Sequence, residues 1–163
     1  MHSKCYLHRD IKPENFMIGI NQNRNHVYMI DFGLAKRFKN NNNIHMCVKT
    51  GKKLVGTARY ASINCHKGIE MARRDDLESF IYLLIYMLKG KLPWQGLPGR
   101  NREEKYEHIK QSKIATTTKA LCSGCPIEFF YFLDHVKSLK FKEKPNYRYL
   151  RYLLLNIMKN NGI

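Results

Sequence analysis

The chain has 163 residues, enough for one domain with its own core, and 44% of them are hydrophobic, which excludes a disordered protein. Its 29 Lys and Arg residues outnumber 13 Asp and Glu residues, so the formal net charge is +16 and acidic partners are favoured. The sequence has no basic segment with interleaved aromatic residues and no finger spacing, so we expect no specific nucleic-acid site. No apolar run approaches the length of a membrane span, so no membrane partner is expected.

The five cysteines form an odd, scattered set, and the sequence begins without a signal-peptide pattern. Such a set is typical of a reducing compartment, so we expect an intracellular protein of the cytoplasm or nucleus. Cys122 and Cys125 form a single CxxC pair. Because no second CxxC or HxxxH follows at zinc-site spacing, this pair predicts unpaired thiols rather than a metal site.

The first third of the sequence predicts a small β-hairpin. The runs "FMIG" (16–19) and "HVYMID" (26–31) favour strands, and the polar "NQNRN" between them favours a turn. Residues 37–53 include an asparagine run and have neither helical nor strand periodicity. They predict a long loop, which in a compact domain is usually functional or mobile.

The remaining two thirds predict four helices. Over residues 75–89, apolar side chains recur at helical spacing and also occupy the opposite face, so this helix is expected at the centre of the domain. Asp76 lies in its first turn, where an ordinary helix-start acid would also be stabilised. Three further helices are expected over residues 101–111, 125–139 and 146–160. The predicted fold is therefore mainly α, with a short β-hairpin followed by an all-helical bundle around a central buried helix.

The segment "HRDIKPEN" (8–15) gathers groups that suit a magnesium nucleotide. It places Asp10, Lys12 and Asn15 within six residues, and Asp31 follows at the length of a hairpin. One carboxylate and the amide could ligate Mg²⁺ while the other carboxylate accepts a hydroxyl proton. Taken alone, the pattern is also compatible with a simple turn, because Asp and Asn are common in turns.

A second motif, "IDFGLAK" (30–36), follows a predicted strand. Together the two motifs resemble the catalytic and metal-binding loops of eukaryotic protein kinases, and "DIKPEN" resembles the serine/threonine type. Four later segments narrow the resemblance to casein kinase 1, which has "SIN" where most kinases have "APE". They are "GTARYASIN" (56–64), "RRDDLES" (73–79), "LPWQGL" (92–97) and "KPNYRYLR" (144–151).

The resemblance implies a role for each matched residue. Asp10 is expected to be the catalytic base, with Lys12 beside the transferred phosphate. Asn15 and Asp31 are expected to hold Mg²⁺ and, with it, the ATP cofactor. Three further residues are expected to be structural: His8 and Phe32 in the apolar stack that joins the two kinase lobes, and Asp76 as the anchor of the catalytic-loop backbone.

Members of casein kinase 1 prefer acidic or already phosphorylated substrates and bind anions at two basic pockets. Two groups of residues match these pockets: a first basic cluster of Arg9, Lys36 and Lys52, and a second basic cluster of Arg59, Gly96 and Lys105. Arginine grips phosphate bidentately and lysine adds point charge, so both clusters suit phosphate. Taken singly, Lys52 and Lys105 are equally compatible with solvated surface charges.

The resemblance places the chain in the C-terminal lobe of the kinase fold, as a single partial domain (1–163) with an activation segment over 31–66. In kinases the glycine-rich loop, strand lysine and helix glutamate of the ATP site precede the catalytic loop, and only seven residues precede His8. We therefore expect a truncated domain that is inactive alone and has an apolar face for a partner to cover.

The expected function is transfer of the ATP γ-phosphate to Ser or Thr of acidic or phosphorylated proteins. The alternative is a kinase-like module that binds acidic or phosphorylated peptides without catalysis.

Overall fold

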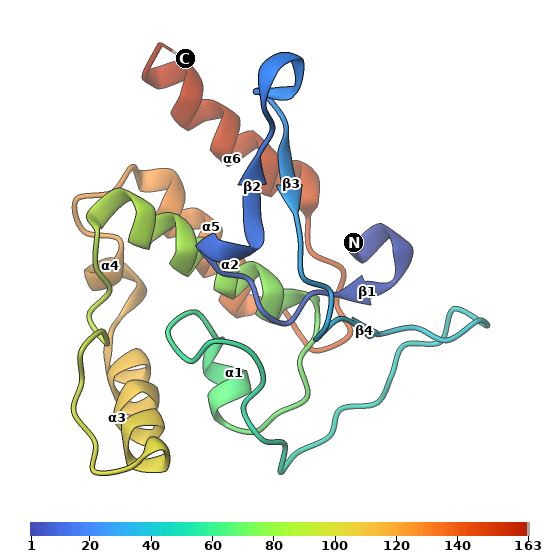
Figure 1. The fold of residues 1–163 in the computed structure, drawn as a ribbon, viewed down its shortest axis with the longest axis vertical. Coiled ribbons are helices and arrows are strands. Elements are labelled where there is room, and N and C mark those ends of the chain that lie inside the picture. Colours follow the sequence, from blue (N-terminus) through green and yellow to red (C-terminus); the bar gives the residue numbers. More distant parts are fainter. Residues whose placement is uncertain (163) are drawn as a thin grey trace.

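A computed structural model describes residues 1–162 as a mainly helical domain with two small antiparallel sheets (Figure 1). This is the architecture predicted for a kinase-like C-terminal lobe. Among these residues, no helix is both long enough and apolar enough to cross a membrane. In chain order the elements are β1 (Tyr6–Leu7), β2 (Phe16–Ile18), β3 (Val27–Met29), β4 (Lys36–Arg37), α1 (Ile63–His66), α2 (Arg73–Lys89), α3 (Arg102–Ala115), α4 (Thr118–Leu121), α5 (Ile127–Ser138) and α6 (Tyr147–Asn160), with short 3-10 turns at His2–Lys4, Pro13–Asn15 and Asn21–Asn23.

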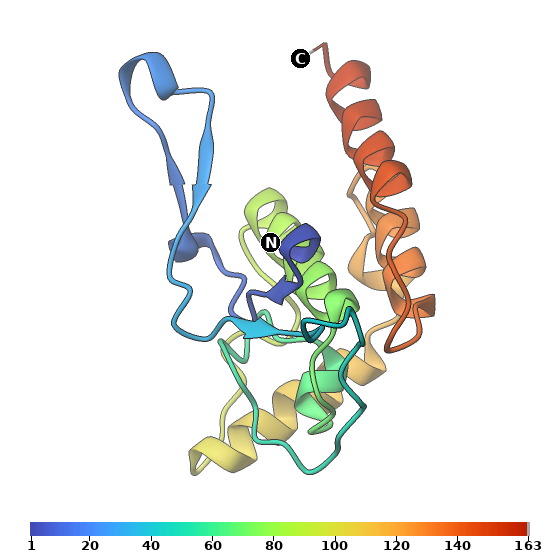
Figure 2. The same ribbon diagram turned by 90° about the vertical axis from the view of Figure 1, so that its right-hand side faces the viewer.

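The predicted hairpin is confirmed. Strands β2 and β3 pair antiparallel, with Phe16 opposite Met29 and Ile18 opposite Val27. The ribbon projects from the body of the domain, and Figure 2 shows it and α6 on opposite sides, with the N-terminal residues between them. Because little covers the hairpin, Ile18 is 73% exposed and Val27 is 67% exposed.

A second strand pair was not predicted. β1 pairs antiparallel with β4, so that Leu7 lies opposite Lys36 and Tyr6 opposite Arg37. Arg37 therefore belongs to a strand and not to the predicted loop. Two-residue strands are too short to show a periodicity, and this pairing joins the start of the chain to the segment that follows "IDFG".

The four predicted helices are confirmed as α2, α3, α5 and α6, but the one-turn helices α1 and α4 were missed. Each of the missed helices begins at a hydroxyl cap. The Ser62 Oγ accepts from the Cys65 amide at 3.0 Å, and the Thr117 Oγ1 accepts from the Ala120 amide at 3.2 Å. Four residues carry a cap but no repeat, so hydrophobic periodicity could not detect them.

Helix α2 is the centre of the core, as predicted, and it packs against α5, which in turn packs against α6. Ile81 and Ile85 of α2 and Leu133 of α5 are fully buried. The last turn of α2 extends beyond this core, because Met87 and Leu88 are 66% and 53% exposed. The buried part of α2 supports the loops at its N-terminal end, where the candidate site lies.

Candidate active site

Asp10 lies in the loop between β1 and β2, and donors surround its carboxylate. The Lys12 Nζ lies 2.8 Å from Oδ2, while the Thr57 amide and hydroxyl donate to Oδ1 at 2.9 and 2.8 Å. Burial raises the pKa of Asp10, but the Lys12 and Thr57 donors outweigh it and hold this pKa below its ordinary value. Asp10 is therefore ionised at neutral pH and can accept a proton.

Asn15 lies next to this carboxylate, and its backbone bond to Ile30 holds the residue that precedes Asp31. The Asn15 Nδ2 donates to the backbone carbonyl of Asp10 at 2.8 Å, and the Ile30 amide donates to the Asn15 carbonyl at 3.0 Å. Asp31 follows directly, with φ 59°, and its Oδ1 accepts from the Gly33 amide at 3.2 Å. A carboxylate and an amide oxygen are ligands that Mg²⁺ accepts, with waters and substrate phosphates completing its shell.

The ammonium of Lys12 pairs with the Asp10 carboxylate at 2.8 Å. Its hydrogen bond to Asp10 raises the pKa of Lys12, and the negative charge of Asp31 raises it further. The backbone bond between Ile30 and Asn15 is the contact that positions Asp31, the next residue, relative to the Asp10 loop. The candidate residues predicted from the two motifs lie together in space.

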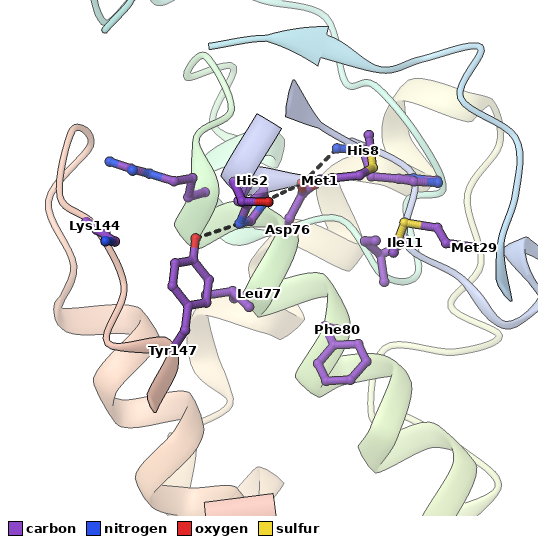
Figure 3. A pocket seen from close by; sticks show the side chains of 12 residues that line it. Met1, His2, His8, Ile11, Met29, Asp76, Leu77, Phe80, Lys144 and Tyr147 are labelled. Atoms are coloured by element: carbon purple, nitrogen blue, oxygen red, sulfur yellow. Dashed lines mark hydrogen bonds and ion pairs between the residues drawn. The ribbon is translucent and has the colours of Figure 1, made fainter. Parts of the chain in front are cut away.

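Asp76 of α2 accepts from the backbone of the loop that carries Asp10. Its Oδ2 accepts from the His8 amide at 2.8 Å, and its Oδ1 accepts from the Arg9 amide at 2.9 Å. The His2 Nε2 lies 2.9 Å from the same Oδ2 (Figure 3). Because Arg9 has φ 68°, an unfavourable conformation for its side chain, these bonds stabilise a strained turn.

His8 and Phe32 link the same loop to the "IDFG" segment. The buried His8 ring makes a 3.0 Å hydrogen bond to the Ile30 carbonyl through Nε2. Its centroid lies 5.7 Å from that of Phe32 in an edge-on arrangement. Phe32 itself is 53% exposed, so one side of this stack lies open.

A cavity of about 590 Å³ lies beside Asp76, between α2, the N-terminal residues and the start of α6 (Figure 3). Leu77 and Phe80 of α2, together with Ile11 and Met29, make its wall largely apolar. This is where the structure leaves the N-terminal half of α2 partly uncovered.

Gly56 brings the segment before α1 against the Asp10 loop. It has φ 82°, and a Cβ at this position would lie 2.3 Å from the Arg9 carbonyl oxygen. A side chain is therefore excluded both by conformation and by contact. The close approach places Thr57, the next residue, within reach of the Asp10 carboxylate.

The first basic cluster is brought together but is partly neutralised. Arg9, Lys36 and Lys52 line one cavity of about 190 Å³. Glu70 lies in the same cavity and pairs with the Lys36 Nζ at 2.9 Å. The Arg9 Nε donates to the Leu34 carbonyl at 2.7 Å. Lys53 also lines this cavity and adds a cation that the sequence analysis did not include, so it offsets the charge of Glu70.

The second basic cluster is also brought together, in a larger cavity of about 490 Å³ that Arg59, Gly96 and Lys105 line. Arg102 adds a third cation to its wall, and Glu14 is the one carboxylate among its lining residues. The Arg59 guanidinium lies 5.5 Å from the centroid of the Tyr86 ring, a contact that orients it. The chemistry of this wall suits a phosphate or a carboxylate.

Several residues of these sites were missed in the sequence, and Arg102 and Thr57 are two of them. Arg102 could have been found, because it precedes Lys105 by three residues on a predicted helix and therefore shares its face. Thr57 follows Gly56 in "GTARY", but its contact with Asp10 joins residues 47 positions apart and leaves no local pattern.

A helical bundle that supports an ionised, buried carboxylate beside two candidate magnesium ligands is typical of phosphotransferases. The family model of the protein kinase domain matches residues 1–146. Because this match covers most of the chain, the chain belongs to the protein kinase family. Protein kinases generally use ATP and Mg²⁺, and the oxygen atoms of Asn15 and Asp31 fit that requirement.

Proposed function

We propose that the chain is the phosphate-transfer part of a casein kinase 1-like serine/threonine kinase that acts on acidic or phosphorylated proteins. The observation that carries this proposal is the ionised Asp10 carboxylate, held between Lys12 and Thr57 and next to Asn15. In this proposal residues 31–66 are the activation segment.

The "SIN" segment supports the casein kinase 1 assignment, because it is bound to acids of "RRDDLES". The Ser62 Oγ donates to the Asp75 Oδ1 at 2.6 Å, and the Ile63 amide donates to the Glu78 Oε1 at 2.8 Å. Both acids are buried in α2. Two of the four segments that resemble casein kinase 1 therefore form one hydrogen-bonded unit.

The proposed chemistry assigns each side chain a separate task. Asp10 accepts the proton of the substrate hydroxyl, since its lowered pKa keeps it ionised. Lys12 offsets negative charge on the transferred phosphate. Asn15 and Asp31 would hold Mg²⁺, which when bound neutralises and orients the ATP phosphates.

Substitution of Asp31 tests the nucleotide site. We expect Mg²⁺–ATP to shift the NMR amide resonances around Asn15 and Asp31, and Asp31→Asn to weaken this binding at least about tenfold, or about 1.4 kcal/mol. The physical reason is the loss of one negative metal ligand. Asp134→Asn, at an exposed position of α5, is the matched control. Equal affinities of wild type and Asp31→Asn would contradict the assignment.

Substitution of Arg59 tests substrate recognition. An acidic phosphopeptide should bind more tightly than its unphosphorylated twin, and Arg59→Ala should weaken phosphopeptide binding about tenfold while leaving the twin nearly unaffected. Fluorescence anisotropy measures both affinities. Arg148→Ala, an exposed cation on α6, controls for net charge. Indifference to both phosphate and Arg59 would remove this cavity from the proposal.

The alternative function, a peptide-binding module without catalysis, is favoured by the cavity of the second basic cluster, because none of Asp10, Asn15 and Asp31 lines it. The two experiments separate the proposals. Phosphopeptide binding that depends on Arg59, with no response to Mg²⁺–ATP, would support the module.

A further inference from the structure

Lys113 is a buried cation that the proposed chemistry does not use. It lies near the end of α3 and is only 1% exposed. Its Nζ donates to the carbonyl of Ala58 at 2.9 Å and also to the carbonyl of Ala61. The same Nζ lies 5.0 and 5.1 Å from the ring centroids of Trp94 and Tyr82. Two carbonyls and two aromatic faces thus replace the water around the ammonium.

No carboxylate pairs directly with this ammonium among residues 1–162. Glu78 is an acid that acts on it through space, and its Oε1 already accepts from the Ile63 amide and the Tyr82 hydroxyl. Burial of a lysine without an ion pair costs free energy unless hydrogen bonds to its ammonium compensate for the lost water. The two carbonyls are therefore the relevant partners.

Those carbonyls belong to the Thr57 turn, which we define as residues 57–61. The amides of Tyr60 and Ala61 both donate to the Thr57 carbonyl at 2.9 Å, which closes the turn. Three of its other carbonyls have partners outside the turn. That of Arg59 accepts from the Trp94 Nε1 at 2.7 Å and that of Ala61 accepts from Lys113. That of Ala58 accepts from Lys113 and also lies 3.0 Å from the His66 Nε2. Lys113 is thus the donor that contacts the turn at two points.

The Thr57 turn connects the two candidate sites. At its start, Thr57 donates twice to the Asp10 carboxylate. In its middle, the backbone carbonyl of Arg59 accepts from Trp94 while the Arg59 side chain lines the cavity of the second basic cluster. A displacement of this turn would move Thr57 away from Asp10 and, at the same time, move Arg59 away from its cavity.

We propose that Lys113 is a positioning residue that anchors the Thr57 turn to α3 and so sets the position of Thr57 at Asp10 and of Arg59 at the second basic cluster. The significance of both positions rests on the proposed function. The anchor itself is a property of the fold and is measurable without nucleotide or substrate.

The charge of this anchor changes near neutral pH. Burial lowers the pKa of Lys113 to about 7, although the charge of Glu78 opposes the shift. The same burial and the charge of Lys113 lower the pKa of His66 to about 4, so His66 is neutral there. The titratable groups around the ammonium are Glu78 and Tyr82 of α2 and Cys65 and His66 of α1. Glu107 and Lys110 of α3 in turn act on the pKa of His66.

Loss of the proton weakens the hydrogen bonds to Ala58 and Ala61 and removes the attraction to the rings. The turn should therefore loosen as pH rises through about 7. The free energy of unfolding of the whole domain changes in the opposite direction. The unfolded chain binds the proton up to about pH 10.5 and the folded chain only to about pH 7, so this group makes the free energy of unfolding rise with pH across that window.

The experiment is an NMR titration of the full chain between pH 5.5 and pH 9, roughly spanning that folded-state pKa. We expect the Lys113 ¹³Cε resonance and the amide resonances of Thr57 and Arg59 to share one midpoint. In Lys113→Met the amide transition should disappear. Hydrogen exchange of the Tyr60 and Ala61 amides should also accelerate at least about tenfold in that variant, while exchange in α5 is unchanged.

Lys110→Met is the matched control, because Lys110 lies on the same helix and pairs with Glu107 at the surface. It should leave the shared midpoint and the exchange rates as in wild type. Should Lys113→Met fail to fold, the wild-type titration still decides. Thr57 and Arg59 resonances that do not follow Lys113, or unchanged exchange in Lys113→Met, would overturn the inference. A negative result in the Mg²⁺–ATP or phosphopeptide experiments would not change the expected NMR titration or hydrogen exchange, so the two proposals can fail separately.

Discussion

Replacing Asp76 by alanine is expected to lower the free energy of unfolding by about 3 kcal/mol or more. The carboxylate accepts from the buried amide of His8 and the partly buried amide of Arg9, and alanine leaves both donors without a partner. Each stranded buried donor costs about 1–3 kcal/mol. The strained backbone of Arg9 also loses the bond that holds it. Urea unfolding followed by circular dichroism at pH 7 measures the difference.

Two further variants make this result specific. Asp134→Ala removes an exposed acid from α5 and should change the free energy of unfolding by less than about 0.5 kcal/mol. Asp76→Asn keeps one acceptor oxygen, so its stability should fall between those of wild type and Asp76→Ala. If Asp76→Ala unfolds within about 1 kcal/mol of wild type, the two amide bonds do not stabilise the loop as argued.

Asp76 also shows where sequence reasoning stops. Its place in the first turn of a helix is compatible with an ordinary helix-start acid, and the family resemblance supplied the alternative of a loop anchor. The hydrogen bonds to His8 and Arg9 span 68 and 67 residues, and only the folded chain brings these atoms together. The long helices, in contrast, were predictable because their apolar repeat is local.

The basic clusters show the same division. The sequence selected residues that share two cavities, but it did not indicate that Glu70 would neutralise Lys36 in the first or that Arg102 would add charge to the second. Lys113 lies beyond the helix predicted over 101–111, and no pattern in the sequence distinguished it from other polar residues. Its burial depends on Tyr82 and Trp94, which come from other parts of the chain.

The candidate site contains strained backbone conformations that neighbouring elements stabilise. Arg9 and Asp31 both have positive φ, and Gly56 is pressed against the Arg9 carbonyl. Such conformations persist where the surroundings hold them, here through Asp76 of α2 and the Thr57 turn. The site therefore depends on packing between α2, α3 and the segment before α1, and a core substitution in these elements should disturb the geometry of the site.

Trp94 is the residue at which core and site are most closely joined, and Trp94→Ala is expected to lower the free energy of unfolding by about 4 kcal/mol. The side chain is 1% exposed, and its ring centroid lies 4.9 Å from that of Tyr82. Its Nε1 donates to the Arg59 carbonyl at 2.7 Å, so removal of the ring also frees the Thr57 turn. Phosphopeptide affinity should fall in the same variant.

Trp94→Phe separates packing from the hydrogen bond. Phenylalanine keeps an aromatic face for Tyr82 and Lys113 but has no N–H for the Arg59 carbonyl, so the loss should be about 1–2 kcal/mol. Urea unfolding by circular dichroism is the suitable probe, since the protein has a single tryptophan. If both variants lose equal stability, the hydrogen bond and not the ring holds the turn. If Trp94→Phe binds phosphopeptide like wild type, Arg59 is positioned without that bond, and the remaining contacts of the turn, those of Lys113 and Thr57 and the Tyr86 ring, account for its placement.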